Sequence, residues 1–163
     1  MKFIIIGLGN FGGNLSKALI KDGHEVFGID IDMLKVEKYK EDLTHVISIN
    51  VNDEASIKHL PLTDTNAVVV AIGEDVGSSV SATALLKKNY KGRIIVRSIN
   101  EIHTSILEAM GIEEIIKPEK EFAYELAHRI NVREALKSMD LPGQYEIIEV
   151  KIPPALVGLT LKD

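Results

Sequence analysis

The sequence has no cysteine, no excess of positive charge and no long apolar run. Without cysteine, disulfide bonds and thiolate chemistry are excluded. Its 19 lysine and arginine residues against 24 aspartate and glutamate residues give a formal net charge of −5. That balance argues against a nucleic-acid partner, which would require a basic face. No stretch approaches the roughly 20 apolar residues of a membrane span. Lys2 precedes only four apolar residues, which indicates a strand rather than a signal peptide.

These absences predict a cytoplasmic protein without direct membrane insertion, so that any membrane role comes through a partner. Charged residues make up 26% and hydrophobic residues 45% of the 163 residues, as in ordinary globular proteins. A chain of this length corresponds to one domain, or to one domain and a fragment of another.

The stretch Gly7-Leu8-Gly9-Asn10-Phe11-Gly12 stands between an apolar run at residues 2–6 and a helical pattern at residues 14–22. This is the strand–turn–helix context of a dinucleotide-binding GxGxxG motif. We expect Gly7 to form the tight turn, Gly9 to let a pyrophosphate approach the backbone, and Gly12 to let the helix pack closely on the strand. Free N–H groups at the start of the helix would bind the phosphates.

An acidic residue at the end of the next predicted strand favours this interpretation over an ordinary glycine-rich turn. The strand spans residues 25–30, and Asp30 lies about 20 residues past the motif, where a carboxylate can accept both ribose hydroxyls of an adenosine. Asp32 adds a second negative charge, which would repel a 2′-phosphate. The pattern therefore predicts an adenosine nucleotide and disfavours NADP.

Strands and helices alternate along the rest of the chain. Further strands are predicted at residues 45–49, 67–72, 93–98 and 114–116, and helices at residues 32–41, 53–60, 75–88 and 102–110. Six such strands predict an α/β fold, a Rossmann-like doubly wound six-stranded parallel sheet with right-handed crossovers. Its ligand would lie at the switch point between strands one and four. That mouth would be lined by residues 7–12, Asp30, residues 50–52 and residues 71–73.

Residues 119–139 predict a long helix, either continuous or broken near Asn131. Its apolar stripe, formed by Ala123, Leu126, Ala127 and Ile130, would pack either on the protein's own sheet or on a second subunit. Pro142-Gly143 marks a boundary, followed by a strand at residues 145–152. The apolar end of the chain, residues 155–161, is too short to form a core of its own. We therefore expect a nucleotide-binding domain at residues 1–140, and at residues 141–163 a linker and the truncated start of a further lobe.

An enzyme is the less favoured interpretation. A dehydrogenase needs a substrate-binding region that carries an acid–base group, and only residues 141–163 follow Asp140. The five histidines are scattered without metal-ligand spacing. Glu74-Asp75 is more typical of a charge pair at a helix N-terminus than of a catalytic pair. A nucleotide-binding module whose output is a change of shape remains, with an NAD-dependent oxidoreductase fragment as the alternative.

The whole chain resembles the regulator-of-K⁺-conductance (RCK) family, also called the KTN or TrkA-N domain, of Trk/Ktr-type potassium uptake systems. The matching stretches are residues 6–13, residues 23–26 running into Asp30, residues 70–73, residues 107–111 with residues 115–119, and residues 157–161, which look like the opening of the TrkA-C lobe. The resemblance implies a cytosolic subunit on a separate membrane K⁺-translocating protein. Such subunits form dimers and often octameric rings, gated by ATP/ADP or NAD(H).

The resemblance also implies roles for individual residues. The glycine loop and Asp30 would hold the phosphates and the ribose, Asn50, Val51 and Asn52 would flank the adenine, and Arg97 would lie near the phosphates. Glu119 falls where some members place a cation at the dimer interface. The implied cofactor-binding residues are Gly7, Leu8, Gly9, Asn10, Phe11, Gly12, Asp30, Ile31, Asn50, Val51, Asn52, Ala71, Ile72, Gly73 and Arg97.

One departure from the family affects the expected ligand. Ktr-type members carry an arginine where this chain has Asn10, and a guanidinium is suited to a terminal phosphate. Its replacement favours NAD(H) or a diphosphate over ATP. A competing interpretation is the regulatory domain of a K⁺/H⁺ antiporter or channel, fused to the membrane part. The start of the chain at Met1, just before the first strand, favours a free-standing subunit at the inner face of the membrane.

Overall fold

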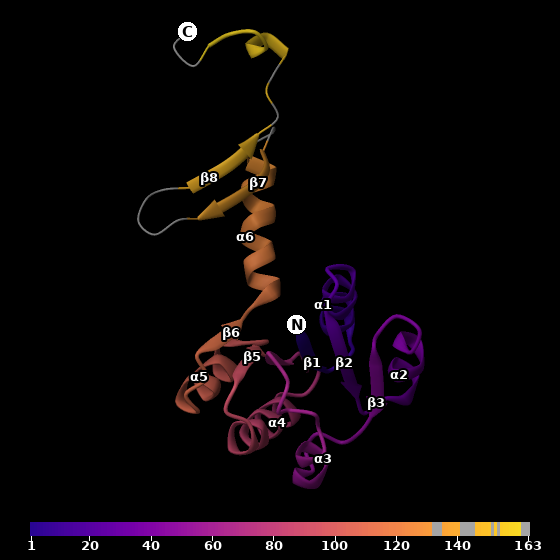
Figure 1. The fold of residues 1–163 in the computed structure, drawn as a ribbon. Helices are drawn as coiled ribbons and strands as arrows, with labels where there is room; N and C mark the ends of the chain where they lie inside the picture. Colours follow the sequence, from indigo (N-terminus) through magenta and orange to yellow (C-terminus); the bar gives the residue numbers. More distant parts are fainter. Residues whose placement is uncertain (132–134, 141–145, 151, 153, 161–163) are drawn as a thin grey trace. The chain divides into compact units, whose positions relative to one another are not determined.

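The computed structural model describes residues 1–131, 135–140, 146–150, 152 and 154–160. The chain forms two compact units, Met1–Ile116 and Lys117–Asp163, which are coloured from indigo to salmon and from orange to yellow in Figure 1. Each unit is described by itself below.

The first unit is a six-stranded sheet with helices on both faces. Its elements are β1 (Lys2–Ile6), α1 (Asn10–Lys21), β2 (Glu25–Asp30), α2 (Met33–Tyr39), β3 (His45–Ser48), α3 (Glu54–Lys58), β4 (Ala67–Val70), α4 (Val76–Asn89), β5 (Arg93–Arg97), α5 (Glu101–Ala109) and β6 (Glu114–Ile116). The strand order is β3-β2-β1-β4-β5-β6, and every neighbouring pair is parallel. The expected doubly wound fold and its switch point between β1 and β4 are confirmed.

Each face of this sheet is covered by its own apolar cluster, because successive side chains of a strand point to opposite sides. Ile4 and Ile6 of β1 belong to the cluster that includes residues of α3, α4 and α5. Ile5 belongs to the cluster that includes Tyr39 of α2 and the apolar face of α1. The central strands β1 and β4 are buried from both sides, which explains why their sequences are continuously apolar.

Helix α1 begins earlier than expected. The helical pattern predicted a start at residue 14, whereas α1 starts at Asn10 with Gly9 as its N-cap. Glycine disfavours helices, but Gly12 and Gly13 lie in the first turn because neighbouring groups leave no space for a side chain there. A Cβ on Gly13 would lie 2.0 Å from the hydroxyl of Tyr39. Close packing therefore outweighs helix propensity at these positions.

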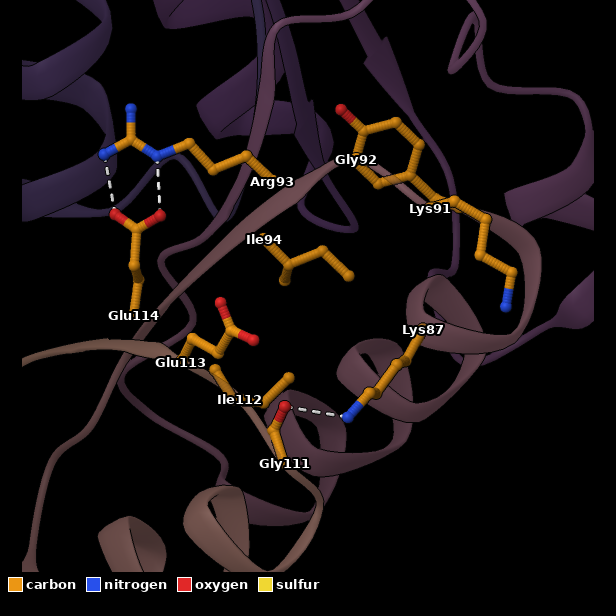
Figure 2. A pocket seen from close by; sticks show the side chains of 10 residues that line it. Lys87, Lys91, Gly92, Arg93, Ile94, Gly111, Ile112, Glu113 and Glu114 are labelled. Carbon is orange, nitrogen blue, oxygen red and sulfur yellow. Dashed lines mark hydrogen bonds and ion pairs between the residues drawn. The ribbon is translucent and has the colours of Figure 1, made fainter.

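An open hollow of about 470 Å³ lies at the amino ends of β5 and β6 (Figure 2). The guanidinium of Arg93 spans the carboxylate of Glu114 in two hydrogen bonds of 2.6 Å. Lys87 donates to the carbonyls of Met110 and Gly111, directly after α5. Arg93 therefore connects β5 to β6, and Lys87 connects α4 to the end of α5. The hollow lies at the edge of the sheet opposite the glycine motif.

The second unit contains α6 (Pro118–Asn131), β7 (Ala135–Asp140), β8 (Glu146–Val150) and a 3₁₀ turn at Pro154–Leu156. The helix expected over residues 119–139 is wrong in its second part. Residues 135–140 form a strand because they pair antiparallel with β8, and this pairing satisfies their backbone groups instead of a helix. The strand expected after the Pro142-Gly143 boundary is confirmed as β8, whereas Pro142 and Gly143 themselves lie outside the described residues. Along the sequence, the division between the two compact units falls between Ile116 and Lys117, and the domain boundary expected after residue 140 stays a prediction.

No helix in the described part of the chain combines the length and the apolar character that crossing a membrane requires.

Helix α5 buries a histidine side chain completely. His103 has no exposed surface, and neither ring nitrogen has a hydrogen-bond partner among the described residues. Burial lowers the pKa of His103 below its usual 6.5. The unfolded chain therefore binds a proton at a higher pH than the folded chain does. The free energy of unfolding therefore does not depend on His103 above about pH 6.5, where this side chain is neutral in both states, and it decreases as the pH falls below that value.

We expect the free energy of unfolding to decrease between pH 7.5 and pH 5.5, and His103→Leu to remove part of that decrease. The part due to one proton is at most about 1.4 kcal/mol per pH unit. Urea unfolding at several pH values measures it, with His45→Gln, an exposed histidine of β3, as the control. Identical pH slopes in the parent and His103→Leu would contradict this account.

Candidate functional site

The segments that follow β1, β2 and β4 meet at the carboxyl edge of the sheet. The N–H of Gly7 donates to the carbonyl of Ile29 at 2.7 Å, and the N–H of Ala71 donates to the carbonyl of Ile6 at the same distance. The glycine motif is thereby fixed between the ends of two neighbouring strands. This is the switch point at which doubly wound sheets bind their ligands.

The glycines of the motif differ in what surrounds them. Gly7 has a φ of +97°, which favours glycine. A Cβ on Gly12 would lie 1.9 Å from the carbonyl oxygen of Gly7, so that only glycine allows α1 to approach β1. A Cβ on Gly9, by contrast, would meet no atom within 4 Å. The fold therefore requires Gly7 and Gly12, whereas the backbone at Gly9 is open to an approaching group.

The carboxylate of Asp30 ties the glycine turn to the end of β2. Asp30 is buried, with 8% of its surface exposed. Its Oδ2 accepts the N–H of Leu8 at 2.7 Å, and its Oδ1 accepts the N–H of Asp32 at 2.9 Å. A carboxylate offers about four acceptor positions, so these two bonds leave it able to accept ribose hydroxyls as well. The sequence pattern predicted a bond from Asp30 to ribose, which stays a prediction, but it did not predict these two bonds to the backbone.

The loop after β3 is tied to the beginning of α4 through side chains. The amide of Asn52 donates to the hydroxyl of Ser78 at 2.9 Å, and that hydroxyl donates to Asp75 at 2.6 Å. The bond from Ser78 is the main reason why the pKa of Asp75 lies below its usual value. Asn50 accepts the N–H of Asn52 at 3.0 Å. Val51 is buried in the apolar core, so the expected contact of this loop with a base involves its backbone and its asparagines.

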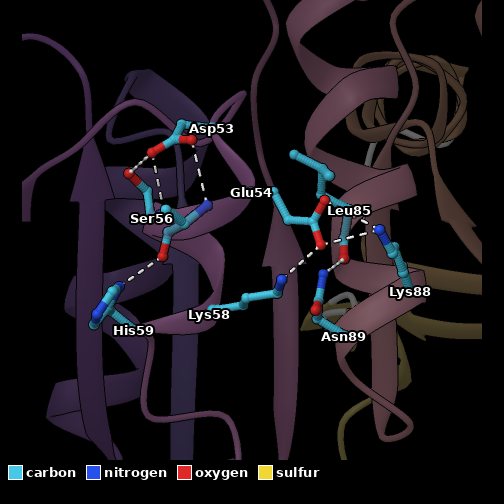
Figure 3. Close-up of polar contacts among 9 residues, drawn as sticks. Asp53, Glu54, Ser56, Lys58, His59, Leu85, Lys88 and Asn89 are labelled. Carbon is cyan, nitrogen blue, oxygen red and sulfur yellow. Dashed lines mark hydrogen bonds and ion pairs between the residues drawn. The ribbon is translucent and has the colours of Figure 1, made fainter.

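The other end of the same loop is anchored by α3, as Figure 3 shows. Asp53 accepts the N–H groups of Ala55 and Ser56 and thereby caps the helix. Glu54 pairs with Lys58 at 2.9 Å and with Lys88 of α4 at 3.0 Å. The loop over residues 50–52 is thus supported on both sides by α4.

Arg97 extends from the end of β5 toward the glycine motif. A Cβ on Gly73 would lie 2.2 Å from its guanidinium, and the guanidinium lies over the ring of Phe11 at 5.7 Å. Ala71 packs against Gly12, with its Cβ 3.0 Å from the position that a Gly12 Cβ would take. The structure therefore gathers Arg97 and the expected residues after β4 around the first turn of α1.

Three expected site residues lie at the periphery or elsewhere. Asn10 is exposed in the first turn of α1, and Ile31 is 68% exposed after β2. Glu119 is exposed in the first turn of α6, in the second unit. Within the described residues, no three acidic or histidine side chains form a group that could hold a metal ion. The cation at Glu119 stays a prediction.

Some residues of the site had no signal in the sequence. Gly28 lies in β2 because a Cβ there would be 2.8 Å from the side chain of Leu43. Lys35 of α2 pairs with Glu74 after β4 at 3.5 Å. Only Asp75 caps α4, so the charge pair expected at Glu74-Asp75 divides into a cap and an ion pair with α2. Partners so distant in sequence are not visible in local spacing.

Comparison with known proteins agrees with this geometry. Residues 3–118 match the TrkA-N domain. The chain belongs to the TrkA-N domain family. It is 35% identical over 162 residues to the Ktr system potassium uptake protein C of Bacillus subtilis (strain 168), covering 99% of this chain and 73% of that relative. It is 36% identical over 149 residues to the Ktr system potassium uptake protein A of the same organism, covering 91% and 67%.

Solved structures share the fold of this TrkA-N domain. The NAD(P)-binding domain of an exopolyphosphatase-related protein from Archaeoglobus fulgidus superposes with a TM-score of 0.71 at 20% identity, covering 79% of this chain and 96% of that one. The GsuK channel bound to NAD superposes with a TM-score of 0.62 at 12% identity, covering 71% and 21%.

The different surroundings of Gly12 and Gly9 predict opposite effects of two otherwise equal substitutions. Gly12→Ala forces the turn and α1 apart, and we expect a loss of at least about 2 kcal/mol in the free energy of unfolding. Gly9→Ala leaves stability within about 0.5 kcal/mol, because its methyl group meets open space. Denaturant unfolding of both variants measures the difference. Equal stability of the two would show that the close contact at Gly12 is readily relieved.

Proposed function

We propose that this TrkA-N domain is a nucleotide-binding regulatory unit of a potassium uptake system. In this proposal it gates a membrane K⁺-translocating protein through a ligand-dependent change of conformation. The observation that carries the proposal is the open backbone at Gly9 beside the buried carboxylate of Asp30. The two Bacillus subtilis relatives, both named potassium uptake proteins, support the biological setting.

The proposed ligand is an adenosine nucleotide, NAD(H) or ADP/ATP. Asp30 would accept the ribose hydroxyls, the N–H groups at the start of α1 would bind phosphate, and Arg97 would add positive charge. Asp32 beside Asp30 would repel a 2′-phosphate, so NADP is disfavoured. The GsuK channel, which shares this fold, was solved with NAD bound. With Asn10 at the start of α1, we expect no special preference for a third phosphate.

The proposed output is conformational rather than chemical. The polar side chains at this edge hold the loops: Asp30 bonds to the glycine turn, and Ser78 connects Asn52 to Asp75. A nucleotide that contacts these groups would change the segments after β1, β3 and β4 together. A membrane partner at the inner face of the membrane would respond to that change.

Self-association through α6 is part of the proposal. Phe122, Leu126 and Ile130 recur every four residues and thus lie on one face of the helix. Their surfaces are 53%, 40% and 70% exposed. Exposed apolar residues in such a row are typical of protein–protein contacts. We propose a dimer through this face and, by family resemblance, assembly into an octameric ring, with Glu119 near an interface cation.

The nucleotide site is tested with Asp30→Asn and a control, Glu114→Gln. Both carboxylates accept two hydrogen bonds, Asp30 from backbone N–H groups and Glu114 from the guanidinium of Arg93, but Glu114 lies at the opposite edge of the sheet from the glycine motif. Only Asp30→Asn is expected to weaken nucleotide binding, by about 1.5–3 kcal/mol for the lost bonds to ribose. Titration calorimetry with ATP, ADP, AMP, NAD and NADH gives the affinities.

In the parent protein, a ligand at 100 times its dissociation constant should add roughly 2.7 kcal/mol to stability in a thermal-shift comparison. Absence of binding by all five nucleotides would refute the nucleotide site. Equal losses of affinity in Asp30→Asn and Glu114→Gln would show that Asp30 acts only on the fold.

The self-association is tested with Leu126→Glu. A charge in the middle of the apolar face must be desolvated if that face is buried in a dimer, so we expect the variant to be monomeric at concentrations where the parent is a dimer. Tyr124→Glu is the control, because Tyr124 is also exposed (61%) but lies two residues from Phe122 and hence on another face. Light scattering measures both. A monomeric parent, or equal effects of the two changes, would refute this interface.

A further inference from the structure

An ion pair crosses the edge of the sheet at the glycine motif. Lys35 lies in α2, which follows β2, and Glu74 follows β4. In the sheet, β1 lies between β2 and β4, and the glycine turn continues from β1. The 3.5 Å contact between Lys35 Nζ and Glu74 Oε1 therefore connects the segments on the two sides of that turn. The segment that carries Glu74 packs closely on the glycine turn. A Cβ on Gly7 would lie 3.0 Å from the backbone N of Ile72, two residues before Glu74.

This ion pair has no structural role that would require it. The side chain of Glu74 is 85% exposed, and an ion pair so exposed contributes little to stability. Asp75 rather than Glu74 caps α4. The side chain of Lys35 is only 31% exposed, and the partner that its ammonium contacts, Glu74, follows β4 beside the turn. Glu74 is therefore a weak partner that a more highly charged anion can replace.

The balance of charge around the turn favours such a replacement. Asp30, Asp32, Glu74 and Asp75 place four carboxylates at this edge, whereas Lys35 and Arg97 are the cations that the described contacts bring there. A nucleoside diphosphate carries more than one negative charge close to the turn and needs an opposing cation. Hydrogen bonds between an ammonium and a phosphate are stronger than neutral ones.

We infer that Lys35 binds the phosphates of the nucleotide and that Glu74 competes with them for it, which makes this pair a determinant of phosphate affinity. The inference rests on the proposed nucleotide function. Replacing Lys35 removes a cation from the phosphates, and replacing Glu74 removes their competitor. The two partners of one ion pair therefore have opposite effects on binding, which a purely structural ion pair would not have.

The experiment compares Lys35→Gln and Glu74→Gln by titration calorimetry with ADP and with adenosine, at low and high salt. We expect Lys35→Gln to weaken ADP binding about fivefold or more and Glu74→Gln to tighten it about two- to fivefold, while adenosine binding stays within about twofold. The salt dependence of ADP binding should decrease in Lys35→Gln, because one screened attraction is lost.

The matched controls are Lys40→Gln and Glu37→Gln. These residues form another exposed ion pair of 3.5 Å that involves α2, and we expect both variants to bind ADP as the parent does. Unchanged ADP affinity in both test variants, or an equal loss of ADP and adenosine binding in Lys35→Gln, would overturn the inference while leaving the proposed function intact. A parent that binds neither ADP nor any other of the five nucleotides would overturn both.

Discussion

The carbonyl oxygen of Gly7 leaves no space for a side chain at residue 12, and the arrangement of the first unit depends on this contact. It brings the first turn of α1 against the end of β1, so that the N–H groups of the helix face the switch point of the sheet. The positive φ of Gly7 lets the chain turn sharply between the end of β1 and the start of α1. With the turn so fixed, the N–H of Leu8 reaches Asp30. The tight packing that builds the fold thereby also builds the site.

Asp30 joins stability to binding in a single carboxylate. Because it accepts backbone N–H groups from the glycine turn after β1 and from the residues just after β2, the acceptor positions left for a ligand have fixed directions. Hydrogen bonds also fix the loop after β3, where Ser78 of α4 connects Asn52 to Asp75. Such ties restrict the loops before any ligand arrives, which reduces the entropy lost on binding. They also connect the loops, and under the proposed function these hydrogen bonds would carry a shift in one loop to its neighbours.

The local features of this chain were predictable from its sequence, and the non-local ones were not. Glycine spacing, the acidic end of β2 and the alternation of apolar runs with helical patterns are short-range signals, and they sufficed for the sheet and for Asp30. The start of α1 was predicted too late because helix propensity argues against Gly12 and Gly13, whereas packing requires them. Residues 135–140 have the composition of a helix, and only their pairing with β8 makes them a strand. Asn52 lies 26 residues from Ser78, and Glu74 lies 39 residues from Lys35, beyond any local pattern.

An acidic chain that is proposed to bind an anion needs its positive charge in the right place rather than in excess. The net charge is −5, and carboxylates lie around the glycine turn, so the overall charge disfavours the approach of phosphates. Under the proposal, attraction would come at short range, from N–H groups at the start of α1 and from Arg97 and Lys35, because salt screens close contacts only weakly. In the proposed function, the carboxylates would contribute to selectivity: a ligand whose phosphates reach these donors would bind, and a ligand with a charge near Asp30 and Asp32 would be repelled. Selectivity between nucleotides would follow from where along the ligand its charges lie, rather than from how many it carries.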